Sequence, residues 1–175
     1  NIVRGNVFYE ARGTLTMRHG NGNVIENNIF FGNDVDHTGG IRVINKNQII
    51  RNNYLEGLTG YRFGSGLTVM NGVPNSPINR YHQVENATII NNSFINVRHI
   101  QLAAGSDDER SAVPINSVVK NNVFVNNKQQ PFTLFDDVSG IKFTNNISTT
   151  QPPTQLSYGI EQENISLKRD KNGLM

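Results

Sequence analysis

Asparagine recurs through this chain at one phase of a short apolar pattern, and this periodicity constrains the fold more than any other feature. The pattern is a short apolar run, then Asn or Asn-Asn, then two residues that are usually apolar. It occurs within residues 2–8, 24–30, 49–55, 89–94, 118–124 and 143–147, with a weaker copy at 163–165. Its markers are 22, 25, 39, 30, 24 and 18 residues apart: Asn6, Asn28, Asn53, Asn92, Asn122, Asn146 and Asn164. A short period with occasional insertions predicts a solenoid whose longer coils carry protruding loops.

The residues around these markers favour β-strands over a leucine-rich repeat of similar period. Leucine-rich repeats need a Leu-x-x-Leu-x-Leu skeleton, whereas β-branched residues, Phe and Asn dominate here. Asn tolerates the left-handed turn conformation, and stacked Asn side chains can bond to one another along a solenoid axis. Asn could instead simply mark polar loops, but its recurrence at one phase argues against that alternative. We therefore predict an all-β chain that forms a right-handed parallel β-helix.

A second set of predicted strands alternates inward and outward residues and would form one face of a parallel sheet. The predicted inward residues are Leu15, Met17, Ile41, Val43, Leu67, Val69, Ile100, Leu102, Phe132 and Leu134. The predicted outward residues are Thr16, Arg18, Arg42, Ile44, Thr68, Met70, Gln101, Ala103, Thr133 and Phe135. An elongated ligand could lie across this outer face and contact one or two side chains in each coil.

Composition narrows the classes of function. Only 36% of residues are hydrophobic and the mean hydropathy is −0.44, which suits an elongated repeat with a narrow interior. The net charge of +2 permits a polyanionic partner, but the basic residues lack the aromatic-interleaved stripe of a nucleic-acid binder. No apolar run approaches the ~18 residues of a membrane helix, so no membrane partner is expected. The absence of Cys excludes thiolate metal sites, and we predict no metal ligands, since Asp34, Asp36 and His37 lack the spacing of a calcium loop.

Several segments, in order and rough spacing, resemble one enzyme family. The most specific are the Arg-His-Gly stretch at 18–20 and the Asn-Ser-Pro-Ile-Asn-Arg-Tyr loop at 75–81. The segments that resemble this family are residues 13–21, 26–33, 39–43, 53–57, 71–81 and 108–110. Over about residues 1–150 the chain resembles the alginate lyase and chondroitinase B family (polysaccharide lyase family 6). The resemblance implies that residues 1–175 are a single β-helix domain fragment, with regular coils to about residue 150 and a terminal coil and tail at 151–175.

The resemblance implies β-elimination on a uronate within an anionic polysaccharide. In that family a Lys removes the C5 proton, Ca²⁺ neutralises the carboxylate, and an Arg lies near the leaving oxygen. Only the Arg can be carried over, onto Arg18. The matching Lys and the calcium ligands would fall upstream of Asn1, so the β-helix would be truncated at its N-terminal end. We therefore expect the missing N-terminal half of the same protein as a partner, and this fragment alone to be inactive.

The resemblance also implies that His19, Arg62 and Arg110 bind the substrate. Arg80 and Tyr81 are further substrate-binding candidates, because they lie in the longest insertion loop and Tyr81 offers a stacking surface. His19 would turn toward the coil interior or its corner, where a purely structural role is as reasonable. Arg62 could be an ordinary loop residue. A guanidinium such as that of Arg80 can hold a uronate carboxylate with two parallel hydrogen bonds, although a surface ion pair is the alternative.

Arg110 matches the first of two consecutive family arginines, and Ser111 replaces the second. This departure favours alginate, which carries carboxylates and no sulfates, over a sulfated glycosaminoglycan. Alternatively, Arg110 simply pairs with Glu109. Arg42 is a weaker candidate of the same kind.

The leading hypothesis is thus an alginate lyase fragment from a secreted or periplasmic protein, whose signal peptide would lie outside this sequence. A chondroitin or dermatan sulfate lyase is the nearer alternative. A non-catalytic, carbohydrate-binding β-helix is the alternative from another class. The preferred uronate and the choice between endo and exo cleavage stay open.

Overall fold

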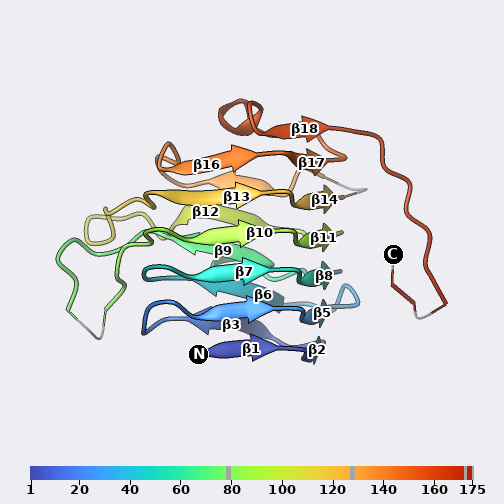
Figure 1. Ribbon diagram of the computed structural model, residues 1–175, viewed down its shortest axis with the longest axis horizontal. Helices are drawn as coiled ribbons and strands as arrows, with labels where there is room; N and C mark the ends of the chain where they lie inside the picture. Colours follow the sequence, from blue (N-terminus) through green and yellow to red (C-terminus); the bar gives the residue numbers. More distant parts are fainter. Residues whose placement is uncertain (78–79, 127–128, 172, 175) are drawn as a thin grey trace.

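The chain folds as a stack of coils, each turning through short β-strands that lie directly above their counterparts in the preceding coil (Figure 1). A computed structural model describes residues 1–77, 80–126, 129–171 and 173–174. Within these residues the strands form three parallel sheets, and the regular helical segments are two short 3-10 turns, η1 (Arg62–Gly64) and η2 (Thr154–Leu156). The predicted all-β parallel β-helix is confirmed. Ile78 and Asn79 of the predicted loop motif lie outside the described residues.

Each complete coil contributes one strand to each of three sheets, which we name A, B and C. Sheet A contains β1 (Ile2–Arg4), β4 (Val24–Glu26), β7 (Ile49–Arg51), β10 (Thr88–Ile90), β13 (Ser117–Lys120) and β16 (Ile141–Thr144). Sheet B contains β2 (Val7–Tyr9), β5 (Ile29–Phe31), β8 (Tyr54–Glu56), β11 (Ser93–Ile95), β14 (Val123–Val125), β17 (Asn146–Ser148) and β18 (Ile160–Gln162). Sheet C contains β3 (Gly13–Met17), β6 (Thr38–Val43), β9 (Leu67–Met70), β12 (Ile100–Ala104) and β15 (Phe132–Leu134).

The predicted asparagine markers form a continuous hydrogen-bonded ladder between sheets A and B. We call Asn6, Asn28, Asn53, Asn92, Asn122 and Asn146 the asparagine ladder. At every step the backbone N–H and the Nδ2 of one Asn donate to the Oδ1 of the Asn in the next coil, over 2.9–3.1 Å. From Asn28 onward these side chains are at most 2% exposed.

The Asn-Asn doublets have a local explanation. The first Asn of each doublet, such as Asn52 or Asn91, has a φ of about 55°, the left-handed conformation that turns the chain between sheets A and B. The second Asn belongs to the ladder. Asn164 was predicted as a marker, and this was wrong: β18 pairs with β17 through Ile160 opposite Asn146, so the ladder ends at Asn146.

The interior is a column of apolar side chains. Phe8 stacks on Phe30 with ring centroids 4.5 Å apart, and Phe94 stacks on Phe124 at 5.0 Å. All ten residues predicted to point inward from sheet C belong to this core or pack against it. Ala103 was predicted to point outward, and this was wrong. A β-bulge shifts the register so that Ala104 pairs with Met70, and Ala103 turns into the core with a φ of 52°.

Two loops and a tail leave this regular stack. The loops between β9 and β10 and between β12 and β13 project together on one side of the coils, and Gly72 and Ala112 join them by two backbone hydrogen bonds. On another side the tail returns from β18 toward the middle coils, where Arg169 pairs with the buried Glu56 at 2.5 Å (Figure 1). Among the described residues, helices long and apolar enough to cross a membrane are not found.

Candidate functional site

The candidate site lies on the outer face of sheet C, where one row of residues runs across all five strands. Thr16, Arg42, Thr68, Gln101 and Thr133 are successive partners in the parallel register. Thr68 and Gln101 are at most 1% exposed, because the loop containing η1 covers the middle of the row. The outer face is therefore open at its ends and covered at its centre, which the period-two pattern alone did not predict.

A second row beside it is apolar. Ile44, Met70 and Ala104 are fully buried although they point away from the main core, and Phe63 and Tyr81 pack against them. Both rings come from loops, Phe63 from η1 and Tyr81 from the β9–β10 loop. This small cluster anchors the two loops onto the sheet.

Three arginines surround these two rings. Arg18 lies over the Tyr81 ring, with its Cζ 4.9 Å from the centroid. Arg110 lies 5.8 Å from the centroids of both Tyr81 and Phe63, and Arg42 lies 5.7 Å from that of Phe63. We call these five residues the arginine–aromatic cluster. Cation–π contacts at such distances hold each guanidinium in place while leaving its N–H groups free to donate.

Polar side chains of the neighbouring coils fix the backbone that carries two of these arginines. Asn45, 4% exposed, donates from Nδ2 to the carbonyl oxygen of Arg18 at 2.7 Å. Asn71, fully buried, donates to the carbonyl oxygen of Arg110 at 3.2 Å and to the Asp136 carboxylate at 2.8 Å. Hydrogen bonds from Ser106, from the Asp137 backbone and from Asn71 hold the pKa of Asp136 below its usual value, so this carboxylate stays ionised.

The charges of the cluster are not all neutralised. Arg110 forms an ion pair with Asp107 and donates from Nε to the carbonyl of Gly105 at 2.7 Å. Within the described residues, neither Arg18 nor Arg42 has a carboxylate partner, and the buried Nε of Arg42 has no hydrogen-bond acceptor. A buried donor without an acceptor is costly, which makes Arg42 a candidate for a functional role.

The predicted site residues fall into two groups. The structure brings Arg18, Tyr81 and Arg110 together in the cluster. Arg80 instead pairs with Glu109, and both side chains are substantially exposed at 41% and 50%. The Arg110–Glu109 pair, which was the alternative to substrate binding by Arg110, does not form, since each residue has another partner.

The two remaining predicted residues lie beside the cluster. His19 is exposed in the turn that follows β3, so of the two predicted positions it takes the corner of the coil and not the interior. Arg62 adopts a left-handed φ of 53° in η1, and its guanidinium lies 6.0 Å from the Tyr61 ring. Sequence reasoning missed Phe63 altogether. Its only signal was an aromatic residue in the Gly-Tyr-Arg-Phe-Gly loop at 60–64.

The calcium implied by the resemblance has no donor set in the described part of the chain. No three His, Cys, Asp or Glu side chains come together there as a possible metal site. The acids nearest the cluster, Asp107 and Asp136, are already engaged with Arg110 and with Asn71 and Ser106.

Comparison with known proteins places this site in a family. The chondroitinase B family model matches residues 1–175. The solved structure of the PL6 family alginate lyase AlyGC is 66% identical, with a TM-score of 0.96, and the match covers 99% of this chain and 24% of that one. An arginine-to-alanine variant of AlyGC matches equally well.

A second solved relative is more distant. A mannuronic acid specific family 6 lyase from the human gut microbiota is 28% identical, with a TM-score of 0.83 over 95% of this chain and 40% of that one. No protein of curated function matches the chain. The chain spans about a quarter of the length of AlyGC. With a family model matched from end to end and a parallel β-helix shared with alginate lyases, the chain belongs to the chondroitinase B family, polysaccharide lyase family 6.

Proposed function

We propose that this chain forms part of the active site of an alginate lyase, which cleaves a uronate polymer by β-elimination. The observation that carries the proposal is the arginine–aromatic cluster, in which Arg18 is exposed and neither Arg18 nor Arg42 has a carboxylate partner among the described residues. A polyuronate supplies one carboxylate per sugar, and guanidinium groups bind carboxylates with two parallel hydrogen bonds. The alginate lyases among its structural relatives support the choice of substrate.

The reaction needs a proton to leave C5 and the 4-O-glycosidic bond to break. The electron pair of the C5–H bond forms the C4=C5 double bond, the C4–O4 bond breaks, and the leaving oxygen takes a proton. An arginine is effectively always protonated, so Arg18 acts by donating hydrogen bonds to the leaving oxygen and by stabilising its developing negative charge. Arg42 and Arg110 would hold carboxylates of the polymer while Tyr81 keeps Arg18 in position.

The base is proposed to come from coils that precede Asn1. The length comparison supports this, because the match covers 99% of this chain and only 24% of the AlyGC chain. The Lys and the calcium ligands implied by the family would then belong to another part of the complete protein.

Alginate is preferred over a sulfated glycosaminoglycan for a local reason. Ser111 follows Arg110 where the family resemblance implies a second Arg, and Arg110 is itself partly neutralised by Asp107. The site thus lacks the extra charge that a sulfate group would require. Because the substrate is an extracellular polymer, we also propose that the protein acts outside the cytoplasm.

The test uses the complete gene product that contains residues 1–175. Incubation with alginate should produce the ultraviolet absorbance of an unsaturated uronate, and dermatan sulfate should produce much less. Arg18→Ala should reduce the rate at least about 100-fold, the loss typical of one transition-state donor. Arg12→Ala, which removes another exposed Arg beside the same strand, is the matched control and should retain full activity.

Three outcomes would contradict the proposal. Near-normal turnover in Arg18→Ala would remove Arg18 from the chemistry. A preference for dermatan sulfate would favour the chondroitinase alternative. Tight binding of alginate without any unsaturated product would favour the non-catalytic carbohydrate-binding alternative.

A further inference from the structure

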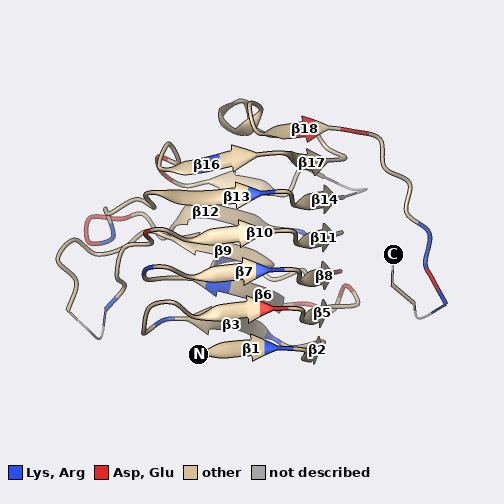
Figure 2. Ribbon diagram, in the orientation of Figure 1, with Lys and Arg blue, Asp and Glu red and all other residues tan. Residues whose placement is uncertain are grey.

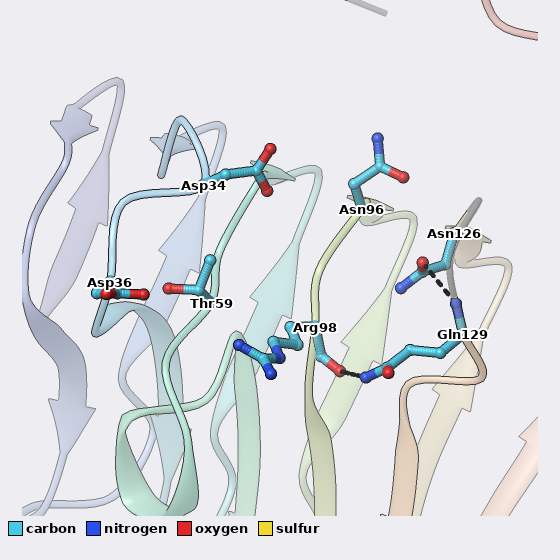
Figure 3. A pocket seen from close by; sticks show the side chains of 7 residues that line it. All are labelled: Asp34, Asp36, Thr59, Asn96, Arg98, Asn126 and Gln129. Carbon is cyan, nitrogen blue, oxygen red and sulfur yellow. Dashed lines mark hydrogen bonds between the residues drawn. The ribbon is translucent and has the colours of Figure 1, made fainter.

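A second polar cavity lies at the corner between sheets B and C, away from the arginine–aromatic cluster. It has a volume of about 300 Å³. Asp34, Asp36 and Thr59 line one end, and Asn96, Asn126 and Gln129 line the other. Figure 3 shows the Arg98 side chain between these two ends. We call this cavity the corner pocket.

The walls of the corner pocket are held by hydrogen bonds between successive coils. Thr59 donates from Oγ1 to the carbonyl of Val35 at 2.7 Å. The Arg98 backbone N–H donates to Leu58 at 2.9 Å. Asn126 donates from Nδ2 to the carbonyl of Val97 at 2.9 Å. The lining side chains therefore project from fixed backbone, and a ligand need not order the walls of the pocket.

The three charged groups of the pocket do not neutralise one another. Across the described part of the chain, Asp34, Asp36 and Arg98 form no ion pair, although all three line the same cavity. The guanidinium of Arg98 also has a direct electrostatic effect on its neighbour: burial and then the charge of Arg98 lower the pKa of His99. One positive and two negative groups thus face the cavity with their hydrogen-bonding capacity unused.

This combination fits a uronate better than other ligands. A uronate has one carboxylate, which a guanidinium binds with two hydrogen bonds, and several hydroxyl groups, which ionised Asp side chains accept from. The amide side chains of Asn96, Asn126 and Gln129 make the other end of the lining polar as well. A simple anion would gain nothing from the two carboxylates, and a neutral sugar would leave Arg98 unpaired. A cavity of about 300 Å³ is at the lower limit for small-molecule sites, which suits one sugar unit.

We propose that the corner pocket is a second uronate-binding site, separate from the site on sheet C. Thr59 of the pocket and Phe63 of the arginine–aromatic cluster belong to the same loop between β8 and β9. A polymer held in the pocket by one sugar is thereby kept close to the sheet C face. The identity of the polymer rests on the proposed function, whereas the binding of a uronate unit here does not require cleavage.

The experiment measures binding of a saturated alginate trisaccharide to the complete protein by calorimetry, in an Arg18→Ala background that prevents cleavage. Two classes of site are expected. Arg98→Ala should weaken one class at least about tenfold, as loss of a charge-assisted pair does, and leave the other unchanged. Lys120→Ala, which removes an exposed cation at the end of β13, is the control and should leave both classes unchanged.

Asp36→Asn distinguishes a sugar site from a weak anion patch. If Asp36 accepts a sugar hydroxyl, its replacement weakens trisaccharide binding, whereas at a plain anion patch the loss of a negative charge strengthens it. The inference is overturned by a single class of site, by an unchanged affinity in Arg98→Ala, by tighter binding in Asp36→Asn, or by equal affinity for a neutral glucose trisaccharide. If Arg18→Ala shows two classes of site but the complete protein with Arg18 intact forms no unsaturated product, the proposed function alone is refuted.

Discussion

Removal of one rung of the asparagine ladder should destabilise the fold far more than removal of the Asn next to it. Asn92 lies in the middle of the ladder, is 1% exposed, and donates from Nδ2 to Ile50, Ile90 and Asn122 over 3.0–3.1 Å. Its Oδ1 accepts the backbone N–H and the Nδ2 of Asn53, both at 3.0 Å. Asn92→Ala removes all five hydrogen bonds and leaves the Asn53 N–H buried without an acceptor.

The magnitude follows from these contacts. Each hydrogen bond contributes about 1 kcal/mol net, and an orphaned buried donor adds about 1–3 kcal/mol. Local relaxation recovers part of this, so we expect a loss of about 4 kcal/mol, which is a large fraction of the typical 5–15 kcal/mol stability of a domain. At about 2–4 °C per kcal/mol for a domain of this size, Tm should fall by roughly 8–16 °C. Asn92→Asp should be at least as harmful near neutral pH, because it places an oxygen against three acceptors.

Asn91→Gly is the matched control. Asn91 is exposed and has a φ of 55°, a conformation that Gly adopts without strain, so its replacement should cost less than about 0.5 kcal/mol. The assay is thermal and urea unfolding of the complete protein, with hydrogen exchange at the Asn53 amide as the local readout. If Asn92→Ala unfolds within about 2 °C of Asn91→Gly, the ladder does not stabilise the solenoid and the reasoning fails.

Three further predictions concern other parts of the structure. Asp136→Ala should loosen the Asn71 contact that holds the Arg110 backbone and raise KM for oligouronates about tenfold, whereas Asp137→Ala should not. Equal KM values for the two variants in steady-state kinetics would contradict this. The pKa of His99 is lowered by burial and by Arg98, so the unfolded state takes up the proton first as the pH falls. The urea midpoint should therefore fall as the pH drops below about 6.5. His99→Gln should flatten this dependence, and an unchanged slope in that variant would refute the prediction. Glu56→Gln should weaken the Arg169 contact and speed proteolysis of the tail at 163–171; wild-type cleavage rates would show that the ion pair does not hold the tail.

The regular part of the fold could be predicted from the sequence because each coil repeats the same pattern of residues. An Asn that hydrogen-bonds to its counterpart in the next coil recurs at the same position of each repeat. Inward apolar residues such as Ile41 and Leu67 recur on strands in which inward and outward residues alternate. Local geometry broke the pattern in two places. The bulge at Ala103 reverses the facing of that residue, and the last strand enters the stack through Ile160, which moves Asn164 out of the ladder.

The candidate site was only partly predictable, because loops bring it together. Arg18 and Arg110 were found through motifs, but the ring of Phe63, which bridges Arg42 and Arg110, has no periodic signal. The burial of Ile44 and Met70 under the loops was likewise not visible in an alternating pattern that made them outward residues. The corner pocket is lined by side chains from the connections between sheets B and C in successive coils (Figure 3), and the alternating pattern of the strands carries no information about these connections.

The pairing of charged residues between coils was likewise not predicted from the sequence. Figure 2 shows basic and acidic residues alternating at the ends of β1, β4 and β7 in sheet A. There the buried carboxylate of Glu26 lies between Arg4 and Arg51, at 3.1 and 2.6 Å. This arrangement is a consequence of the register Arg4–Glu26–Arg51, in which two guanidinium groups share the one carboxylate of Glu26. Among the described residues, Arg18 and Arg42 at sheet C and Arg98 in the corner pocket have no carboxylate partner.

The central claim is that the arginine–aromatic cluster receives the uronate polymer, and a ligand-bound structure tests it most directly. The measurement is a crystal structure of the complete protein with Arg18→Ala, soaked with an alginate oligosaccharide long enough to span several coils. The account predicts a sugar carboxylate within hydrogen-bonding distance of Arg42, and a glycosidic oxygen at the position vacated by the Arg18 guanidinium above Tyr81. An oligosaccharide bound on another face, with Arg42 and Tyr81 untouched, would contradict it.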